Sequence, residues 1–173
     1  DGQLQVKVLI DRTRGTRGNP DSSVNLLAPL MAKYPDNVTV ALYQSPKLSN
    51  PILSRLLKPP MNEVIELTHM KVYLCDDTLI LSGANLSDDY FTKRQDRYVQ
   101  FVDRMLSDFM SGLVRVVSTH AWTLHADGTS KPPPMYEQPN MLYAAAKRDV
   151  IAFMTRATAS ATDTTLQMAA SPP

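Results

Sequence analysis

The sequence predicts an α/β domain in which a mixed β-sheet is flanked by helices. Short apolar runs typical of strands alternate along the chain with stretches of helical periodicity, which is the pattern of layered α/β domains. Apolar residues make up 43% of the 173 residues, enough to build a packed core. The length suits one domain. We expect residues 1–120 to form it and residues 121–173 to form an irregular or partly helical tail of uncertain order.

The first elements are a strand, a loop, a helix and a second strand. Leu4–Asp11 is an apolar run typical of an interior strand, and Arg12–Gly18 predicts a loop with three arginines and two glycines. Asp21, Ser22 and Ser23 are candidate N-caps for a helix that continues through Leu26–Met31. Val38–Tyr43 predicts the next strand.

The middle of the chain predicts three further strands and a helix. Glu66–Cys75 and Thr78–Ser82 are strands separated by the tight turn Asp76–Asp77. Tyr98–Val102 is a candidate fifth strand. Asp103–Thr119 then carries a broad apolar stripe at helical spacing, which predicts a helix packed on the sheet, with membrane-surface contact as the less favoured alternative.

The tail has a different character. Ala144–Met154 can form a helix, whereas Ala157–Pro173 is rich in alanine, threonine and serine and ends in two prolines. We expect that last stretch to be poorly ordered. His120 and His125 lack a lysine two positions later, so we interpret both as ordinary tail histidines.

Composition excludes several classes of function. The formal net charge is +1 and aromatic residues make up 7%, which argues against a nucleic-acid binder. The single cysteine, Cys75, excludes an internal disulfide framework and a cysteine-based zinc site. No apolar run approaches the roughly 18 to 20 residues of a membrane span. The chain begins at Asp1 without a methionine or a visible targeting peptide, so we expect processed or cut ends.

The stretch that carries chemistry is the HxKxxxxD pattern of His69, Lys71 and Asp76. Side chains at i and i+2 of a strand project from the same face, so the imidazole and the ammonium lie together. An imidazole can act as nucleophile or acid–base group, and a neighbouring ammonium can neutralise phosphate oxygens as charge builds up. The pairing therefore suits phosphoryl transfer without a metal. The alternative is that the pair occurs by chance and that Asp76 only forms a turn.

The residues after the motif favour the chemical interpretation. Gly83 follows a strand directly, and a glycine there lets the backbone approach a ligand closely. Asn85, two positions later, can hold a phosphate oxygen or the histidine ring. Asp96 can accept a hydrogen bond from the far nitrogen of His69 and so set its tautomer. Equally, Asp96 and Arg97 can form a local surface pair.

Three arginines follow the first strand, at Arg12, Arg14 and Arg17, with Gly15 and Gly18 between them. They can bind an acidic head group or glycerol phosphate, because guanidinium groups pair with phosphate through charge-assisted hydrogen bonds. A solvated loop is the simpler alternative.

These motifs resemble a known group of enzymes. HxKxxxxD followed by a Gly-x-Asn turn is similar to the catalytic signature of the phospholipase D superfamily, and a half domain of that kind is the implied fold. The stretches Lys71–Tyr98 and Val8–Gly18 closely resemble the eukaryotic phosphatidylglycerophosphate synthases. The resemblance covers roughly residues 6–118 and implies a domain that is truncated at its N-terminus.

The resemblance implies a specific reaction. These synthases transfer the phosphatidyl group from CDP-diacylglycerol to glycerol 3-phosphate, releasing CMP on the route to cardiolipin. They do so without a metal or cofactor, in peripheral contact with the inner mitochondrial membrane. His69 would be the nucleophile that forms a phosphohistidine, or the acid for the leaving group, and Lys71 would bind phosphoryl oxygens. Asp76 would support the site and Asn85 would bind phosphate or orient the histidine. No nucleic-acid partner is implied.

Two departures from the superfamily pattern matter. The usual Gly-Ser-x-Asn is shortened to Gly83-Ala84-Asn85, which leaves open whether Ser82 or Ser87 supplies the missing hydroxyl. The superfamily also builds its site from two HxK motifs, and these residues contain one. We therefore expect a fragment whose second half site lies in a missing C-terminal part and which is inactive alone. Alternatives are a phosphatidylserine synthase, a phosphodiesterase or nuclease acting as a homodimer, and a degenerate non-enzyme.

Overall fold

The computed structural model describes residues 4–18, 20–45 and 70–170. Its contacts divide the chain into two compact units, the first from Asp1–Thr68 and Val116–Ile151 and the second from His69–Arg115 and Ala152–Pro173. The predicted α/β class is confirmed, because helices flank β-sheets in the described part of the chain. One prediction was too simple: the described strands form two sheets where one was expected.

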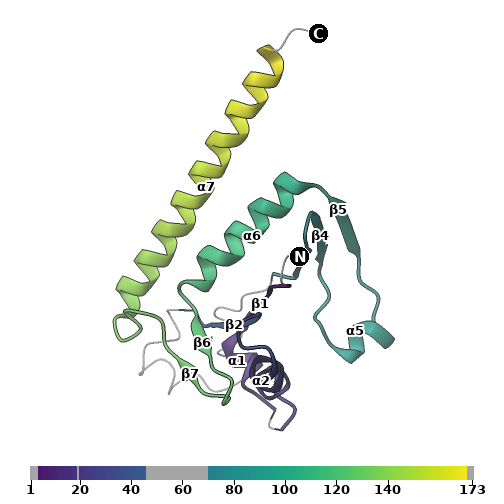
Figure 1. The fold of residues 1–173 in the computed structure, drawn as a ribbon, viewed down its shortest axis with the longest axis vertical. Helices are drawn as coiled ribbons and strands as arrows, with labels where there is room; N and C mark the ends of the chain where they lie inside the picture. Colours follow the sequence, from purple (N-terminus) through teal and green to yellow (C-terminus); the bar gives the residue numbers. More distant parts are fainter. Residues whose placement is uncertain (1–3, 19, 46–69, 171–173) are drawn as a thin grey trace. The chain divides into compact units, whose positions relative to one another are not determined.

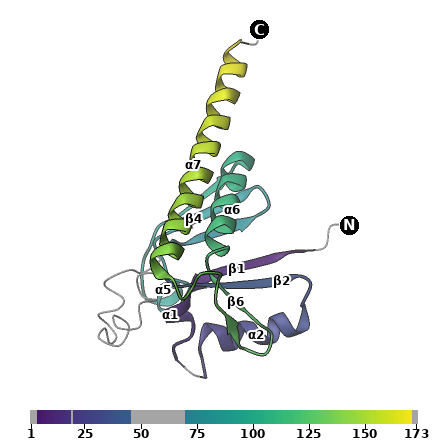
Figure 2. The same ribbon diagram turned by 90° about the vertical axis from the view of Figure 1, so that its left-hand side faces the viewer.

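The first unit is built on a four-stranded mixed sheet in the order β1-β2-β6-β7. Its strands are β1 (Val6–Asp11), β2 (Val38–Tyr43), β6 (Trp122–Leu124) and β7 (Ser130–Lys131). β1 and β2 are parallel along six residue pairs, and β6 is antiparallel to β2 through Leu42 and Trp122. Figure 2 shows β1 and β2 side by side, with β6 next to them.

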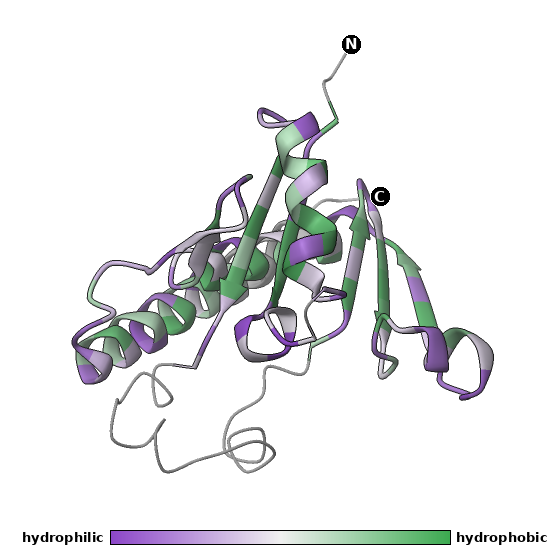
Figure 3. Ribbon diagram, turned by 90° about the horizontal axis from the view of Figure 1, so that it is seen from below, coloured by the Kyte–Doolittle hydropathy of each residue, from purple (hydrophilic) through white to green (hydrophobic). Residues whose placement is uncertain are grey.

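Helix α2 (Ser23–Lys33) makes the crossover that a parallel β1–β2 pair requires. It begins where predicted, because the Ser22 hydroxyl accepts a hydrogen bond from the Asn25 amide at 3.2 Å. Pro29 lies inside the helix. Figure 3 shows α2 with alternating hydrophobic and hydrophilic bands in front of largely hydrophobic strands.

The core of this unit lies between α2 and the sheet. Alternate residues of β2 are buried, which is the period-two pattern of a strand with one face in the core. The buried set consists of Val24, Met31, Val38, Val40, Leu42 and Leu124. Partly buried side chains of β1, with Leu27 and Trp122, pack against it.

The prediction of a loop over Arg12–Gly18 is wrong for its first four residues. Arg12–Gly15 forms a single helical turn, α1, because the Asp11 carboxylate accepts a hydrogen bond from the Arg14 amide at 2.9 Å and caps it. A four-residue turn is too short to show helical periodicity, so the sequence pattern could not reveal it.

The second unit contains a three-stranded antiparallel sheet in the order β3-β4-β5. β3 (Val72–Cys75) and β4 (Thr78–Ser82) form a hairpin through Asp76 and Asp77, as predicted, and Asp76 adopts a left-handed φ of 50°. A short helix α5 (Asp88–Thr92) precedes β5 (Tyr98–Val102), the predicted fifth strand. Residues 66–69 of the predicted longer strand lie outside the described residues.

Helix α6 (Arg104–Ser118) follows β5 as predicted and is capped by Asp103, whose carboxylate accepts from the Leu106 amide at 2.9 Å. Within the second unit, Phe109 of α6 packs on Phe153 of α7 with ring centroids 5.4 Å apart. Gly112 lies under the same ring, and a Cβ there would approach Phe153 to 2.6 Å. The missing side chain of Gly112 therefore makes room for the aromatic pair.

The tail contains more helix than predicted, since residues 157–173 were expected to be poorly ordered. Helix α7 extends over Pro139–Ala170, past the predicted end at Met154 (Figure 1). In the first unit, Nε2 of His120 lies 3.1 Å from Oδ2 of Asp149 of this helix, within hydrogen-bond distance. Among the helices that the structure describes, none has an apolar stretch long enough to cross a membrane. The domain boundary at residue 121 stays a prediction.

Candidate functional site: the Lys71 face of the second sheet

Lys71 lies at the start of the β3–β4 hairpin. The Ser82 amide donates to the Lys71 carbonyl at 3.3 Å, which extends the ladder by one pair beyond β3. Ser82 in turn pairs with Tyr98 of β5. Paired residues of adjacent strands project from the same face. Lys71, Ser82 and Tyr98 therefore form one cross-strand row, and His69 lies outside the described residues.

A second tyrosine shares this face. Tyr73 lies two residues after Lys71, so both side chains project to the same side of β3. Burial raises the pKa of the Tyr73 hydroxyl, and the neighbouring Tyr98 raises it further. The Tyr73 phenol therefore stays a neutral O–H donor at physiological pH. Sequence reasoning missed Tyr73, Tyr98 and the part that Ser82 plays in the row, although the i, i+2 spacing from Lys71 pointed to Tyr73.

The turn after β4 brings Gly83 against Asp96. A Cβ on Gly83 would lie 3.0 Å from both carboxylate oxygens of Asp96, so a larger residue at this position would crowd the carboxylate. Oδ1 of Asp96 also accepts from the Arg97 amide at 2.6 Å. The structure thus joins two of the predicted site residues next to the strand that carries Lys71. The predicted contact between Asp96 and His69 stays a prediction.

The shortened Gly83-Ala84-Asn85 turn is held by a serine hydroxyl. Oγ of Ser82 accepts from the Ala84 amide at 3.0 Å, and Ala84 is fully buried. Ser87 is exposed, lies at the N-cap position of α5 and makes no side-chain capping bond. Of the two candidate hydroxyls, Ser82 is therefore the one that shapes the turn.

Asp76 lies at the other end of the hairpin from Lys71. The two lie five positions apart along the chain, which corresponds to roughly 15 Å in a strand. Asp76 is exposed and its positive φ belongs to the turn. The structure therefore does not bring Asp76 together with Lys71.

Arg12, Arg14 and Arg17 belong to the first unit, and they differ in how far they are buried. Arg14 and Arg17 are exposed. Arg12 is half-buried, with its Cζ 3.8 Å over the Trp122 ring, and its Nη1 donates to Oε1 of Gln44 at 2.8 Å. Burial lowers the pKa of the Arg12 guanidinium, and Tyr136 partly opposes this. Neither Gln44 nor Trp122 was predicted as a partner of Arg12.

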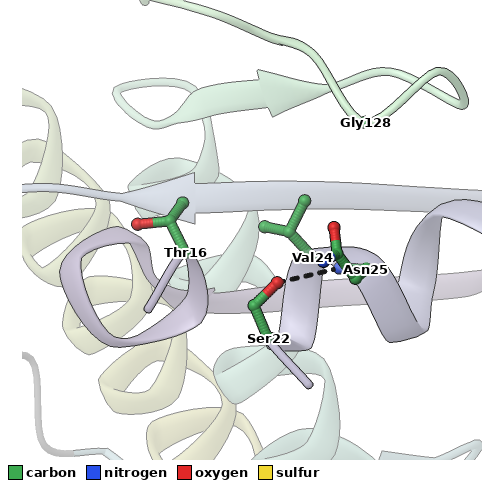
Figure 4. A pocket seen from close by; sticks show the side chains of 5 residues that line it. All are labelled: Thr16, Ser22, Val24, Asn25 and Gly128. Carbon is green, nitrogen blue, oxygen red and sulfur yellow. Dashed lines mark hydrogen bonds between the residues drawn. The ribbon is translucent and has the colours of Figure 1, made fainter. Parts of the chain in front are cut away.

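A pocket of about 260 Å³ lies at the N-terminal end of α2 (Figure 4). Thr16, Ser22, Val24, Asn25 and Gly128 line it. The Ser22 hydroxyl already caps α2 there, as the dashed line of Figure 4 shows. None of the predicted site residues lines this pocket, so it is not the candidate site.

The candidate site therefore combines a lysine, the hydroxyl groups of two tyrosines and a serine, a tight glycine turn and a carboxylate. Such a set can bind and polarise a phosphoryl group.

Comparison with known proteins indicates which kind of phosphoryl group is involved. The chain is 48% identical over 128 residues to the mitochondrial CDP-diacylglycerol–glycerol-3-phosphate 3-phosphatidyltransferase of Homo sapiens, and the match covers 73% of this chain and 22% of that protein.

The chain is homologous to a segment of these phosphatidyltransferases. The Gallus gallus enzyme is 46% identical over 127 residues, covering 73% of this chain and 22% of the relative. The Schizosaccharomyces pombe enzyme is 47% identical over 107 residues, covering 61% and 21%. The chain thus spans about a fifth of the length of the curated relatives it matches, and the resemblance to the synthases is confirmed. No family model and no solved structure matches.

Proposed function

We propose that the chain contributes one half of the active site of a phosphatidylglycerophosphate synthase, within a phospholipase D-like half domain. The enzyme would transfer the phosphatidyl group from CDP-diacylglycerol to glycerol 3-phosphate and release CMP. The observation that carries the proposal is the similarity to phosphatidyltransferases at 46–48% identity over 127 to 128 residues. The Lys71 face supports it, because its groups suit phosphoryl transfer.

In the proposed reaction His69 acts as the nucleophile. Its imidazole attacks the phosphorus that carries diacylglycerol, the bond to the CMP oxygen breaks, and a phosphohistidine forms. The hydroxyl of glycerol 3-phosphate then attacks the same phosphorus and regenerates His69. A second HxK motif, supplied by the remainder of the longer protein, would protonate the leaving CMP and then accept the proton of the incoming hydroxyl.

The described residues have defined parts in this scheme. Lys71 neutralises the non-bridging oxygens as charge moves onto them. Gly83 and Asn85 form the turn that approaches the phosphate, with Ser82 holding it. Asp96 orients His69 and fixes which ring nitrogen attacks. Ser87 is exposed near this turn and would contact the substrate head group.

The proposal includes the location and the partners. The relatives are named as mitochondrial enzymes. We place this protein likewise in mitochondria, in peripheral contact with the inner membrane, because its donor substrate is a membrane lipid. Arg12, Arg14 and Arg17 would bind the phosphate groups of the substrates. No nucleic-acid partner is proposed.

The identity of the acceptor substrate distinguishes this activity from phosphatidyl transfer to serine. A full-length synthase containing these residues is incubated with CDP-diacylglycerol and either glycerol 3-phosphate or serine, and CMP release is measured. We expect CMP release with glycerol 3-phosphate and none above background with serine. Release with serine alone would reassign the acceptor, and release with neither would contradict the proposed function.

A further inference from the structure

Three neighbouring strands bring a polar and aromatic cluster to one edge of the first sheet. Arg12 directly follows β1, and Gln44 directly follows β2. Because these strands are parallel, both residues lie at the same carboxyl edge. Trp122 begins the antiparallel β6 opposite Leu42, close to that edge. Ligands of α/β proteins bind at the carboxyl ends of parallel strands, so this is a favoured place for a site.

The guanidinium of Arg12 is held rigidly. Its face lies 3.8 Å over the Trp122 ring, a cation–π contact, and Nη1 is fixed by the 2.8 Å hydrogen bond to Gln44. Tyr136 supports Trp122 from the side in an edge-to-face contact with centroids 4.7 Å apart. The planar group therefore has its orientation set before any ligand arrives, which lowers the entropic cost of binding.

In the part of the chain that the structure describes, no carboxylate balances the charge of Arg12. Among the described residues, no ion pair involves Arg12, and its buried Nε has no hydrogen-bond acceptor. The buried indole Nε1 of Trp122 also lacks an acceptor there. A half-buried arginine stays charged, and an unpaired charge is costly to bury. An anion with several acceptor oxygens would offset that cost.

We propose that Arg12, clamped by Trp122 and Gln44, is a preorganised binding site for a phosphate group. This inference rests on the proposed function. It separates Arg12 from the exposed Arg14 and Arg17, and it adds Trp122 and Gln44 to the residues of the first unit that are proposed to bind phosphate. The guanidinium face is occupied by Trp122, so recognition takes place along the Nη2 edge, which can form paired hydrogen bonds to phosphate oxygens. The phosphate can be that of glycerol 3-phosphate or that of the cytidine nucleotide.

Binding can be measured without catalysis. Trp122 is the only tryptophan of the 173 residues, so its fluorescence reports directly on the clamp. The chain is titrated with glycerol 3-phosphate, CMP and inorganic phosphate, each against sodium chloride at equal ionic strength. We expect a saturable change that chloride does not produce. Broadening of the ligand's ³¹P resonance provides a second measurement that does not depend on tryptophan.

Gln44→Glu is the sharpest variant because it preserves size and the acceptor for Nη1 while supplying the missing negative charge. The fold should be retained, as circular dichroism will show, and phosphate binding should weaken at least tenfold. Arg12→Lys keeps the charge but removes the planar fork, and should also weaken binding about tenfold. The matched control is Arg156→Gln, an exposed arginine of α7, which should bind as the unmodified chain does.

The outcomes separate this inference from the proposed function. Preference for glycerol 3-phosphate over CMP supports an acceptor clamp, and the reverse preference supports a nucleotide clamp. Absence of saturable binding in both measurements, or equal binding by Gln44→Glu, overturns the inference even if the synthase is active. Binding that persists in a synthase failing both acceptor assays supports the clamp and contradicts only the proposed activity.

Discussion

At the scale of single residues, Lys71 and Asp76 belong to one motif but have different surroundings. Lys71 shares a cross-strand row with Ser82 and Tyr98, whereas Asp76 forms the turn at the far end of the hairpin. In a full-length synthase, Lys71→Ala should lower kcat by about 100-fold or more, the effect of removing a group that stabilises transition-state charge. Asp76→Asn should cost less than about tenfold, because asparagine also tolerates a positive φ.

The rate of CMP release checks both variants, and unfolding curves provide the control for stability. Equal losses of two orders of magnitude in the two variants would show that Asp76 acts in the reaction itself. A Lys71→Ala enzyme that keeps most of its rate would remove Lys71 from the site.

Gly83 tests whether the position of Asp96 matters. A methyl group at Gly83 would lie 3.0 Å from both carboxylate oxygens, so Gly83→Ala should displace Asp96 and lower kcat about tenfold or more. The same change in an Asp96→Ala background should have little further effect, since the carboxylate is then absent. This double-mutant cycle isolates the coupling. Independent, additive losses would show that Gly83 acts in another way.

The motif was predictable from the sequence, but its neighbours were only partly so. His69, Lys71 and Gly83 stand out through spacing that is local along the chain. Tyr98 joins the Lys71 row only through the register of β4 with β5, which depends on pairing between distant segments. The Trp122 stack on Arg12 is equally non-local.

At the scale of elements, local signals predicted the well-formed helices and strands. α2 and α6 have capping residues and apolar periodicity, and β2 is a short, largely apolar run, so each was found at nearly its observed bounds. β6 and β7 have three and two residues, too few for any periodic signal. The division into two sheets follows from strand pairing, which no window of sequence contains.

The packing of α6 on α7 in the second unit gives a prediction of stability. In an exposed helix Gly→Ala would stabilise by about 1 kcal/mol. At Gly112 the added methyl would meet Phe153 at 2.6 Å, so we expect destabilisation by about 1–3 kcal/mol instead. Thermal unfolding measures the change, with Ser111→Ala on the exposed face of α6 as the matched control. A higher melting temperature for Gly112→Ala would show that the two helices do not pack this way.

At the scale of the whole molecule, a lipid substrate requires access to a membrane surface. Leu86 and Phe91, between β4 and β5, are 74% and 62% exposed and follow the turn at Gly83. We expect them to insert into the lipid surface next to the site. The double change Leu86→Glu and Phe91→Glu should strongly reduce co-sedimentation with vesicles of phosphatidylcholine and cardiolipin. Met154→Glu, on α7 and 44% exposed, is the control.

Equal vesicle binding by the double variant and the unmodified protein would show that the membrane contact lies elsewhere. Such a result would leave the chemical proposal standing, because the Lys71 face does not depend on these two side chains.

The most direct test of the central claim is CMP release from CDP-diacylglycerol with glycerol 3-phosphate, comparing a full-length synthase that contains these residues with its His69→Ala variant. The account predicts that the unmodified enzyme releases CMP and that the variant loses about three orders of magnitude or more, because the nucleophile is missing. A variant that folds and keeps most of its rate would contradict the account, since His69 would then have no part in the reaction.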